Sequence, residues 1–99
     1  WRPIEVANLA IGYAMTVTPL QLAQGYTILA AGGVKRPISL VKNDRIPRGE
    51  RVLPEKTVKE LLKMLALVTE KEGTGTRAIV DGYHVGGKTG TAFIASTWV

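Results

Sequence analysis

Apolar residues dominate the first third of the chain, and one stretch there carries a helix start signal. Thr18 can cap a helix, Pro19 suits the first helical position, and Gln21 stands three residues after the cap, as a capping box requires. The following residues leave almost no polar face: Leu20, Leu22, Ala23, Tyr26, Thr27, Leu29 and Ala30. We therefore predict a helix that is buried on most sides and ends at Gly32 and Gly33, where glycine can take a positive φ.

The middle of the chain predicts an extended segment, a loop and an amphipathic helix. Residues 34–41 contain Pro37 and are typical of a short edge strand, whereas residues 43–49 are polar and typical of a surface loop. From Pro54 to about Glu72, apolar and charged residues alternate at helical spacing. One side of this helix should therefore pack against the protein, and the other side should be exposed to water. The apolar set is Val58, Leu61, Leu62, Leu65 and Val68, and the charged set is Lys56, Lys59, Glu60 and Lys63.

The last third of the chain favours extended structure. Residues 73–76 read Gly-Thr-Gly-Thr and indicate a tight connection, because a phosphate-binding loop would need a lysine and a different spacing. After Asp81 and Gly82, β-branched and aromatic residues become common. We predict one strand over residues 83–92 and another over residues 93–99.

Composition and charge exclude several classes of function. The net charge is +5, but the basic residues are scattered and not interleaved with aromatic residues, so we expect no nucleic-acid partner. The chain has no cysteine, which excludes disulfides and cysteine-based zinc sites, and the single His84 cannot build a metal cluster alone. We interpret His84 as a strand residue beside a turn.

Residues 6–34 contain no charge and are numerous enough to cross a bilayer. Pro19, several glycines and several amides and hydroxyls interrupt the stretch, which favours the buried core of a larger soluble domain over a membrane span. No signal-peptide pattern opens the sequence.

Two motifs overlap between Gly82 and Thr91 and make opposite structural demands. Gly82 to Thr89 matches the P-loop pattern G-x-x-x-x-G-K-[ST], which needs a helix that begins at Lys88. The residues after Lys88 are rich in glycine, β-branched and aromatic types, which disfavour a helix. Lys88-Thr89-Gly90 also matches the K-T-G element, which needs a strand with the Thr89 and Thr91 hydroxyls on one face. The context favours K-T-G.

Several stretches along the chain, in order, carry a resemblance to a known family. They are residues 10–24 (AIGYAMTVTPLQLAQ), 31–34 (AGGV), 51–53 (RVL), 73–78 (GTGTRA) and 87–92 (GKTGTA). Together they resemble the transpeptidase domain of class B penicillin-binding proteins, and the first stretch most resembles the division-type, septal members. The resemblance covers nearly the whole chain.

This resemblance implies an α/β (α+β) fold of the penicillin-binding and serine β-lactamase-like type, an antiparallel sheet with flanking helices. It implies that residues 1–99 are a partial transpeptidase domain, running from downstream of the S-x-N element through the K-T-G strand, with no complete second domain. The parent would crosslink peptidoglycan stem peptides through an acyl-serine, bind β-lactam antibiotics and use no cofactor or metal. It would be the periplasmic domain of an inner-membrane-anchored bacterial protein that contacts division-complex membrane proteins.

The resemblance also implies roles for the K-T-G residues. Lys88 would supply positive charge between the catalytic groups and the substrate carboxylate. Thr89, Gly90 and Thr91 would bind the substrate, with the two threonine hydroxyls bonded to its carboxylate. The backbone N–H of Thr91 would be one oxyanion-hole donor, a kind of group whose removal costs about 3 kcal/mol in serine hydrolases.

The nucleophile is expected outside this sequence. Ser39 and Lys42 form the one S-x-x-K match, but that motif needs a helix to bring the amine to the hydroxyl, and Pro37 before it favours extended chain. The S-x-N element is also absent. We therefore expect these residues alone to be inactive.

Three further hypotheses are consistent with the sequence. No turn residue separates the two predicted strands at Ala92 and Phe93, so we expect residues to be missing at this junction. The alternatives to a transpeptidase are a non-catalytic binding or scaffold member of the same fold and a P-loop nucleotide-binding module.

Overall fold

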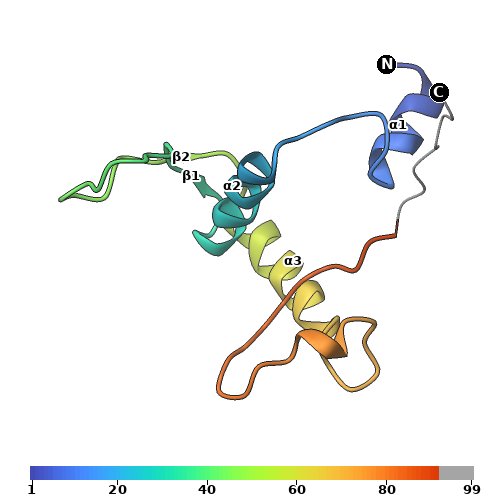
Figure 1. The fold of residues 1–99 in the computed structure, drawn as a ribbon. Helices are drawn as coiled ribbons and strands as arrows, with labels where there is room; N and C mark the ends of the chain where they lie inside the picture. Colours follow the sequence, from blue (N-terminus) through green and yellow to red (C-terminus); the bar gives the residue numbers. More distant parts are fainter. Residues whose placement is uncertain (92–99) are drawn as a thin grey trace, which may run out of the picture.

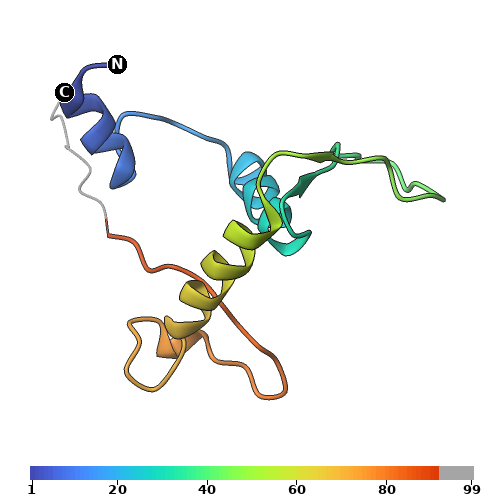
Figure 2. The ribbon, with the colours of Figure 1, turned by 180° about the vertical axis from the view of Figure 1, so that it is seen from behind.

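The computed structural model describes residues 1–91, which form three α-helices, one small sheet and a short 3₁₀ helix. In chain order these are α1 (Pro3–Ala10), α2 (Pro19–Ala30), β1 (Val34–Lys35), β2 (Glu50–Arg51), α3 (Glu55–Leu67) and η1 (Thr76–Ala78). Helices α2 and α3 meet near the sheet, while α1 stands apart at the end of an extended connection (Figure 1). The view from behind in Figure 2 shows the same separation.

Helix α2 begins and ends as its sequence predicts. Thr18 Oγ1 accepts a hydrogen bond from the Gln21 N–H at 3.1 Å, and Gln21 Oε1 accepts one from the Thr18 N–H at 2.9 Å. At the other end Gly32 and Gly33 have φ values of 74° and 101°. The capping box and the glycine stop are both confirmed.

Helix α1 is not among the elements that the sequence predicts, although its first turn carries a similar signal. Pro3 occupies the first turn, and Glu5 Oε2 accepts a hydrogen bond from the Arg2 N–H at 2.8 Å. Arg2 Nη2 lies 3.2 Å from Glu5 Oε1 as well. Arginine is not a usual N-cap residue, so the local sequence does not indicate this helix start.

The prediction that α2 is buried on most sides is wrong for the described part of the chain. None of its residues is buried, and Leu20, Leu22 and Tyr26 are 53%, 57% and 45% exposed. A helix that is apolar all round needs neighbours all round. Residues 1–91 cover only part of the surface of α2. The one fully buried hydrophobic side chain among these residues is Val58, which belongs to α3.

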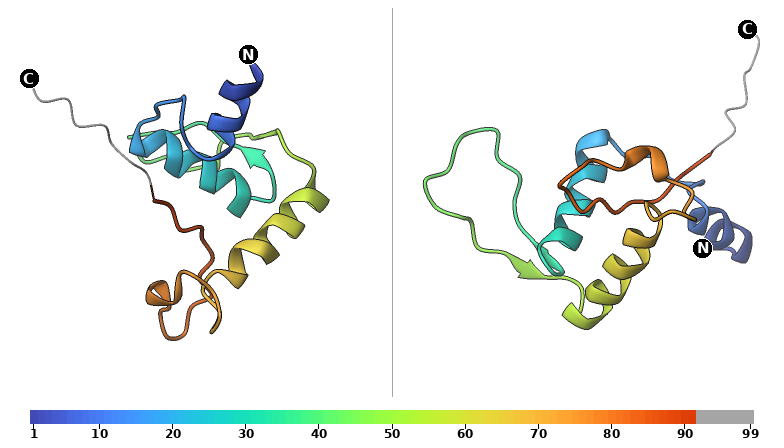
Figure 3. Two further views of the ribbon diagram at one scale, coloured as in Figure 1. Left: turned by 90° about the vertical axis from the view of Figure 1, so that its right-hand side faces the viewer. Right: turned by 90° about the horizontal axis from the view of Figure 1, so that it is seen from below.

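The sheet is shorter than the extended segment that the sequence predicts. Val34 pairs with Arg51 and Lys35 with Glu50 in an antiparallel ladder, and the rest of residues 36–49 form a loop. Pro37 cannot donate to a ladder, which limits the pairing. The predicted surface loop over residues 43–49 is confirmed, and it projects away from the helices (Figure 3).

Gly33 joins the first half of the structure to the second. Its carbonyl accepts hydrogen bonds from the N–H groups of Val52 and Leu53, at 2.9 and 3.2 Å. Arg51 Nη1 donates to the carbonyls of Gly32 and Leu53, at 2.9 and 3.1 Å. A Cβ added at Gly33 would collide with the Leu53 carbonyl and lie 3.2 Å from Val58 Cγ2, so only glycine fits this corner.

Helix α3 is amphipathic as predicted but ends before Glu72. Val58 is buried and Leu61 and Leu65 are half-buried, whereas the lysines of the opposite face are exposed. After Leu67 the backbone bonds shorten to three-residue spacing, as at Val68 and Thr69, and the chain turns through the predicted connection at residues 73–76. The tight connection is therefore confirmed.

The predicted strand over residues 83–92 is wrong for residues 83–91, which belong to no sheet. Strand propensity needs a neighbouring strand, and none lies beside this segment within residues 1–91. The predicted strand over residues 93–99 and the Ala92–Phe93 junction lie outside the described residues. Across residues 1–91, no helix combines the length and the apolar character that a bilayer crossing needs.

We expect Gly33→Ala to destabilise the protein by at least about 1–3 kcal/mol, because it forces a side chain into a positive φ and against the Leu53 carbonyl. Thermal unfolding of the full-length protein measures the effect. Gly82→Ala is the matched control, since Gly82 also has a positive φ but has nothing within 4 Å of an added Cβ, and it should destabilise the protein less. Equal unfolding temperatures for both variants would contradict the role of Gly33.

Candidate active site

Residues 83–91, which we call the K-T-G segment, cross the C-terminal half of α3 (Figure 1). The segment follows a turn in which the Tyr83 N–H donates to the Val80 carbonyl at 3.1 Å and Gly82 has a φ of 81°. Glycine is favoured at such a turn position. The turn therefore reverses the chain, so that the K-T-G segment runs back across α3 (Figure 1).

Two hydrogen bonds hold the K-T-G segment to α3. The Gly87 N–H donates to the Leu65 carbonyl at 3.0 Å, and Thr69 Oγ1 donates to the Val85 carbonyl at 2.6 Å. Between these bonds a Cβ at Gly86 would lie 3.3–3.4 Å from backbone atoms of Leu65 and Ala66. The absence of a side chain at Gly86 therefore allows the two backbones to approach closely.

The predicted site residues Lys88, Thr89, Gly90 and Thr91 are all exposed on this segment. Lys88 Nζ donates to the Thr89 carbonyl at 2.8 Å. Within residues 1–91 the Lys88 ammonium has no carboxylate partner, and the Thr91 N–H has no acceptor. A cation and a backbone donor on one exposed segment can bind an anion.

A contact that the sequence did not predict links Thr89 to the loop after α3. Thr74 Oγ1 and Thr89 Oγ1 lie 3.0 Å apart and share a hydrogen bond. The sequence predicts a tight connection at residues 73–76 and includes them in a family-like stretch, but it predicts no contact with Thr89 and no role for Thr69. Thr69 and Thr74 are distant from the K-T-G residues in sequence, so no local pattern could have found them.

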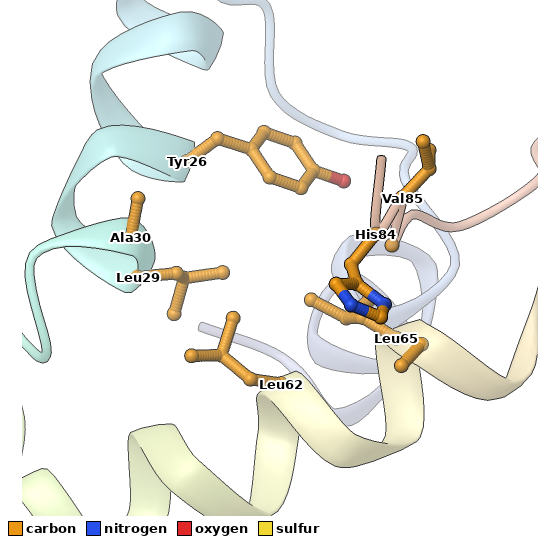
Figure 4. A pocket seen from close by; sticks show the side chains of 9 residues that line it. Tyr26, Leu29, Ala30, Leu62, Leu65, His84 and Val85 are labelled. Carbon is orange, nitrogen blue, oxygen red and sulfur yellow. The ribbon is translucent and has the colours of Figure 1, made fainter. Parts of the chain in front are cut away.

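A pocket of about 400 Å³ lies between α2, α3 and the K-T-G segment (Figure 4). Its lining is Tyr26, Leu29, Ala30, Leu62, Leu65, Ala66, His84, Val85 and Gly86. The Tyr26 side chain points across it toward His84 and Val85. His84 directly follows the turn at residues 80–83, as predicted, but it lines an apolar pocket beside Leu65 and is not a strand residue, which corrects that part of the prediction.

The structure excludes two alternative motifs. No helix begins at Lys88, because residues 88–91 are not helical, so the P-loop requirement is not met. Residues 39–42 form no helix either, and Ser39 Oγ bonds locally to the Val41 carbonyl and N–H, at 2.7 and 3.2 Å. Lys42 therefore cannot activate Ser39 in the way that S-x-x-K requires. In the described part of the chain no group of histidine and acidic residues could hold a metal.

Comparison with known proteins gives one consistent result. The model of the penicillin binding protein transpeptidase domain matches residues 1–98. The chain is 47% identical over 92 residues to the probable peptidoglycan D,D-transpeptidase PenA of Neisseria meningitidis and 42% identical over 92 residues to the peptidoglycan D,D-transpeptidase FtsI of Escherichia coli. Each match covers 93% of this chain but only 16% of the relative's length.

Two solved structures share the fold. The transpeptidase domain of Burkholderia pseudomallei penicillin-binding protein 3 has a TM-score of 0.86 and 41% identity, over 96% of this chain and 29% of its own. A protein described as a peptidoglycan glycosyltransferase of Burkholderia ambifaria has a TM-score of 0.85 and 39% identity, over 94% of this chain and 30% of its own. These likenesses confirm the predicted α+β class and the penicillin-binding transpeptidase fold.

We expect Thr69→Val to loosen the K-T-G segment, because it removes the hydroxyl that donates to the Val85 carbonyl while keeping the side-chain shape. Stability should fall by about 1 kcal/mol, and amide hydrogen exchange at Gly87 should accelerate. Thr57→Val is the matched control, since Thr57 lies on the exposed side of α3. Unchanged exchange at Gly87 in Thr69→Val would contradict the role of this bond.

Proposed function

Because the chain belongs to the penicillin-binding protein transpeptidase domain family, we propose that it is part of a serine-type D,D-transpeptidase that crosslinks peptidoglycan stem peptides. The parent forms an acyl-serine and is trapped by β-lactams in the same step. The names of the PenA and FtsI relatives support this reaction. The chain spans 16% of the length of these relatives, so the nucleophilic serine and the S-x-N element are expected in other parts of the parent.

The observation that carries the proposal is an exposed Lys88 with no carboxylate partner within residues 1–91, on a segment fixed to α3. The ammonium attracts the carboxylate of the stem peptide or of a β-lactam, since a charge-assisted hydrogen bond is stronger than a neutral one. Thr89 and Thr91 donate their hydroxyls to the same carboxylate, and Gly90 leaves room for the ligand beside the backbone. The Thr91 N–H donates to the oxyanion of the tetrahedral intermediate.

Residues 1–99 are part of one transpeptidase domain in this proposal. The exposed apolar side chains of α2, such as Leu20 and Leu22, are then covered by the remainder of that domain. Burying such side chains stabilises a fold by about 1.5–3 kcal/mol each. The large exposed apolar surface of the described residues supports this arrangement.

We assign the parent to septal cell-wall synthesis, as the periplasmic domain of an inner-membrane-anchored protein that contacts other membrane proteins of the division complex. The name of the FtsI relative and the resemblance of residues 10–24 to division-type members support this role.

Depletion of the full-length protein should block septation and produce filamentous cells, because elongation would continue without crosslinking at the septum. Light microscopy of a depletion strain measures cell length. Rounded cells of normal length would indicate an elongation enzyme instead.

We expect Lys88→Ala to slow acylation of the full-length protein by a labelled penicillin about 10- to 100-fold, since it removes a charged donor for the ligand carboxylate. Gel fluorescence and mass spectrometry follow the covalent adduct. Ser39→Ala and Lys42→Ala are controls, because these residues form the S-x-x-K match within this sequence. Both variants should label as fast as the unsubstituted protein.

The same experiment separates a transpeptidase from a non-catalytic scaffold of the same fold. A parent protein that forms no adduct at all would reject the catalytic proposal. Unchanged labelling of Lys88→Ala would reject the role of Lys88 alone.

A further inference from the structure

The hydroxyl of Thr89 has one hydrogen-bond partner within residues 1–91, and that partner comes from another part of the chain. Thr74 Oγ1 lies 3.0 Å from Thr89 Oγ1, although the two residues are fifteen positions apart. The methyl group of Thr89 also lies close to the loop, 3.8 Å from the position of a Cβ at Gly75. Thr89 therefore rests directly against the Gly-Thr loop, residues 73–76.

The Gly-Thr loop is itself folded back onto the end of α3. The Gly73 N–H donates to the Glu70 carbonyl at 2.7 Å, and the Gly75 N–H donates to the Val68 carbonyl at 2.8 Å. A Cβ at Gly73 would collide with the Val68 carbonyl, so this fold needs glycine at that position. Thr74 is left at the tip of the loop, between two anchored glycines.

The K-T-G segment is bonded to the same end of α3. The Leu65 carbonyl accepts a hydrogen bond from the Gly87 N–H, and the Thr69 hydroxyl donates one to the Val85 carbonyl. The loop that carries Thr74 and the segment that carries Thr89 are thus both anchored between Leu65 and Glu70, at the end of α3. Such common support restricts the pair to a narrow range of geometry.

A hydroxyl has one proton and two acceptor lone pairs, so its partners decide which way the proton points. If Thr74 donates to Thr89, then the Thr89 proton cannot point back to Thr74 and is free for an outside acceptor. A chain of two hydroxyls that ends on a carboxylate also polarises in one direction, which strengthens each bond.

We propose that Thr74 is a positioning residue: its hydroxyl donates to Thr89 Oγ1 and so directs the Thr89 proton toward the carboxylate of the bound stem peptide or β-lactam. This inference rests on the proposed function. Thr74 itself does not touch the ligand and acts through Thr89. The Gly-Thr loop is therefore part of carboxylate recognition as well as a connection between two elements.

The test compares acylation of the full-length protein by a penicillin and by the methyl ester of the same penicillin, which lacks the carboxylate charge. Thr74→Val keeps the side-chain shape but removes the hydroxyl, and it should slow acylation by the acid about fivefold while leaving the ester rate unchanged. Thr74→Ser should restore the acid rate. Thr76→Val, the same substitution two residues along the chain, should behave as the parent protein does.

The double variant Thr74→Val with Thr89→Val tests whether Thr74 acts through Thr89. It should acylate no more slowly than Thr89→Val alone, because the hydroxyl that Thr74 orients is already gone. A further loss in the double variant would overturn the inference, since Thr74 would then act independently. Equal slowing of the acid and the ester in Thr74→Val would also overturn it, because that result indicates general damage to the site.

Failure of this inference differs from failure of the proposed function. If Thr74→Val acylates at the parent rate while Thr89→Val is slow, the inference is wrong and the K-T-G segment keeps its role. If Lys88→Ala and Thr89→Val both acylate at the parent rate, the proposed role of the segment is wrong and the inference falls with it.

Discussion

The buried carbonyl of Gly33 is the constraint on which the rest of the described structure depends. It accepts hydrogen bonds from two successive N–H groups, those of Val52 and Leu53, and thereby ties the end of α2 to the start of α3. The positive φ of Gly33 and the lack of space for a Cβ make this corner specific to glycine. Val58, the one fully buried hydrophobic residue among residues 1–91, lies beside it, with its Cγ2 3.2 Å from the position of a Cβ at Gly33. The bonds at Gly33 therefore set the direction of α3, and with it the position of the Gly-Thr loop and the K-T-G segment, which are bonded to the end of α3.

Helix α3 in turn positions the candidate site through its last turn. Carbonyls near the end of a helix have few partners within the helix, and here other parts of the chain bond to them. The carbonyl of Val68, the residue that follows α3, accepts from Gly75, and the Leu65 carbonyl accepts from Gly87 as well as from Val68. The Gly-Thr loop and the K-T-G segment are therefore held at a common end of one helix, which explains how residues so far apart in sequence meet.

Helix α2 is more apolar than its exposure within residues 1–91 would suggest. Its side chains are apolar on nearly every side, yet none is buried within residues 1–91. A helix of that composition is stable when neighbours cover it on several sides, as happens inside a larger domain. The capping box at Thr18 and Gln21 sets where the helix begins regardless of those neighbours, which is why the start of α2 could be predicted although its burial within residues 1–91 could not.

Local signals in the sequence determined the bounds of α2, the polar loop between β1 and β2, the amphipathic face of α3 and, through stretches such as residues 10–24 and the K-T-G residues, the family. Each depends on residues a few positions apart, such as Thr18 with Gln21, so the chain order is enough to specify it. The tertiary structure alone decided that residues 83–91 lie along α3 without a partner strand and that His84 lines a pocket. It also decided that Thr69 and Thr74 form hydrogen bonds to the K-T-G segment. Strand pairing and hydroxyl contacts join residues distant in sequence, and their partners are set only when the Gly33 corner brings the helices together.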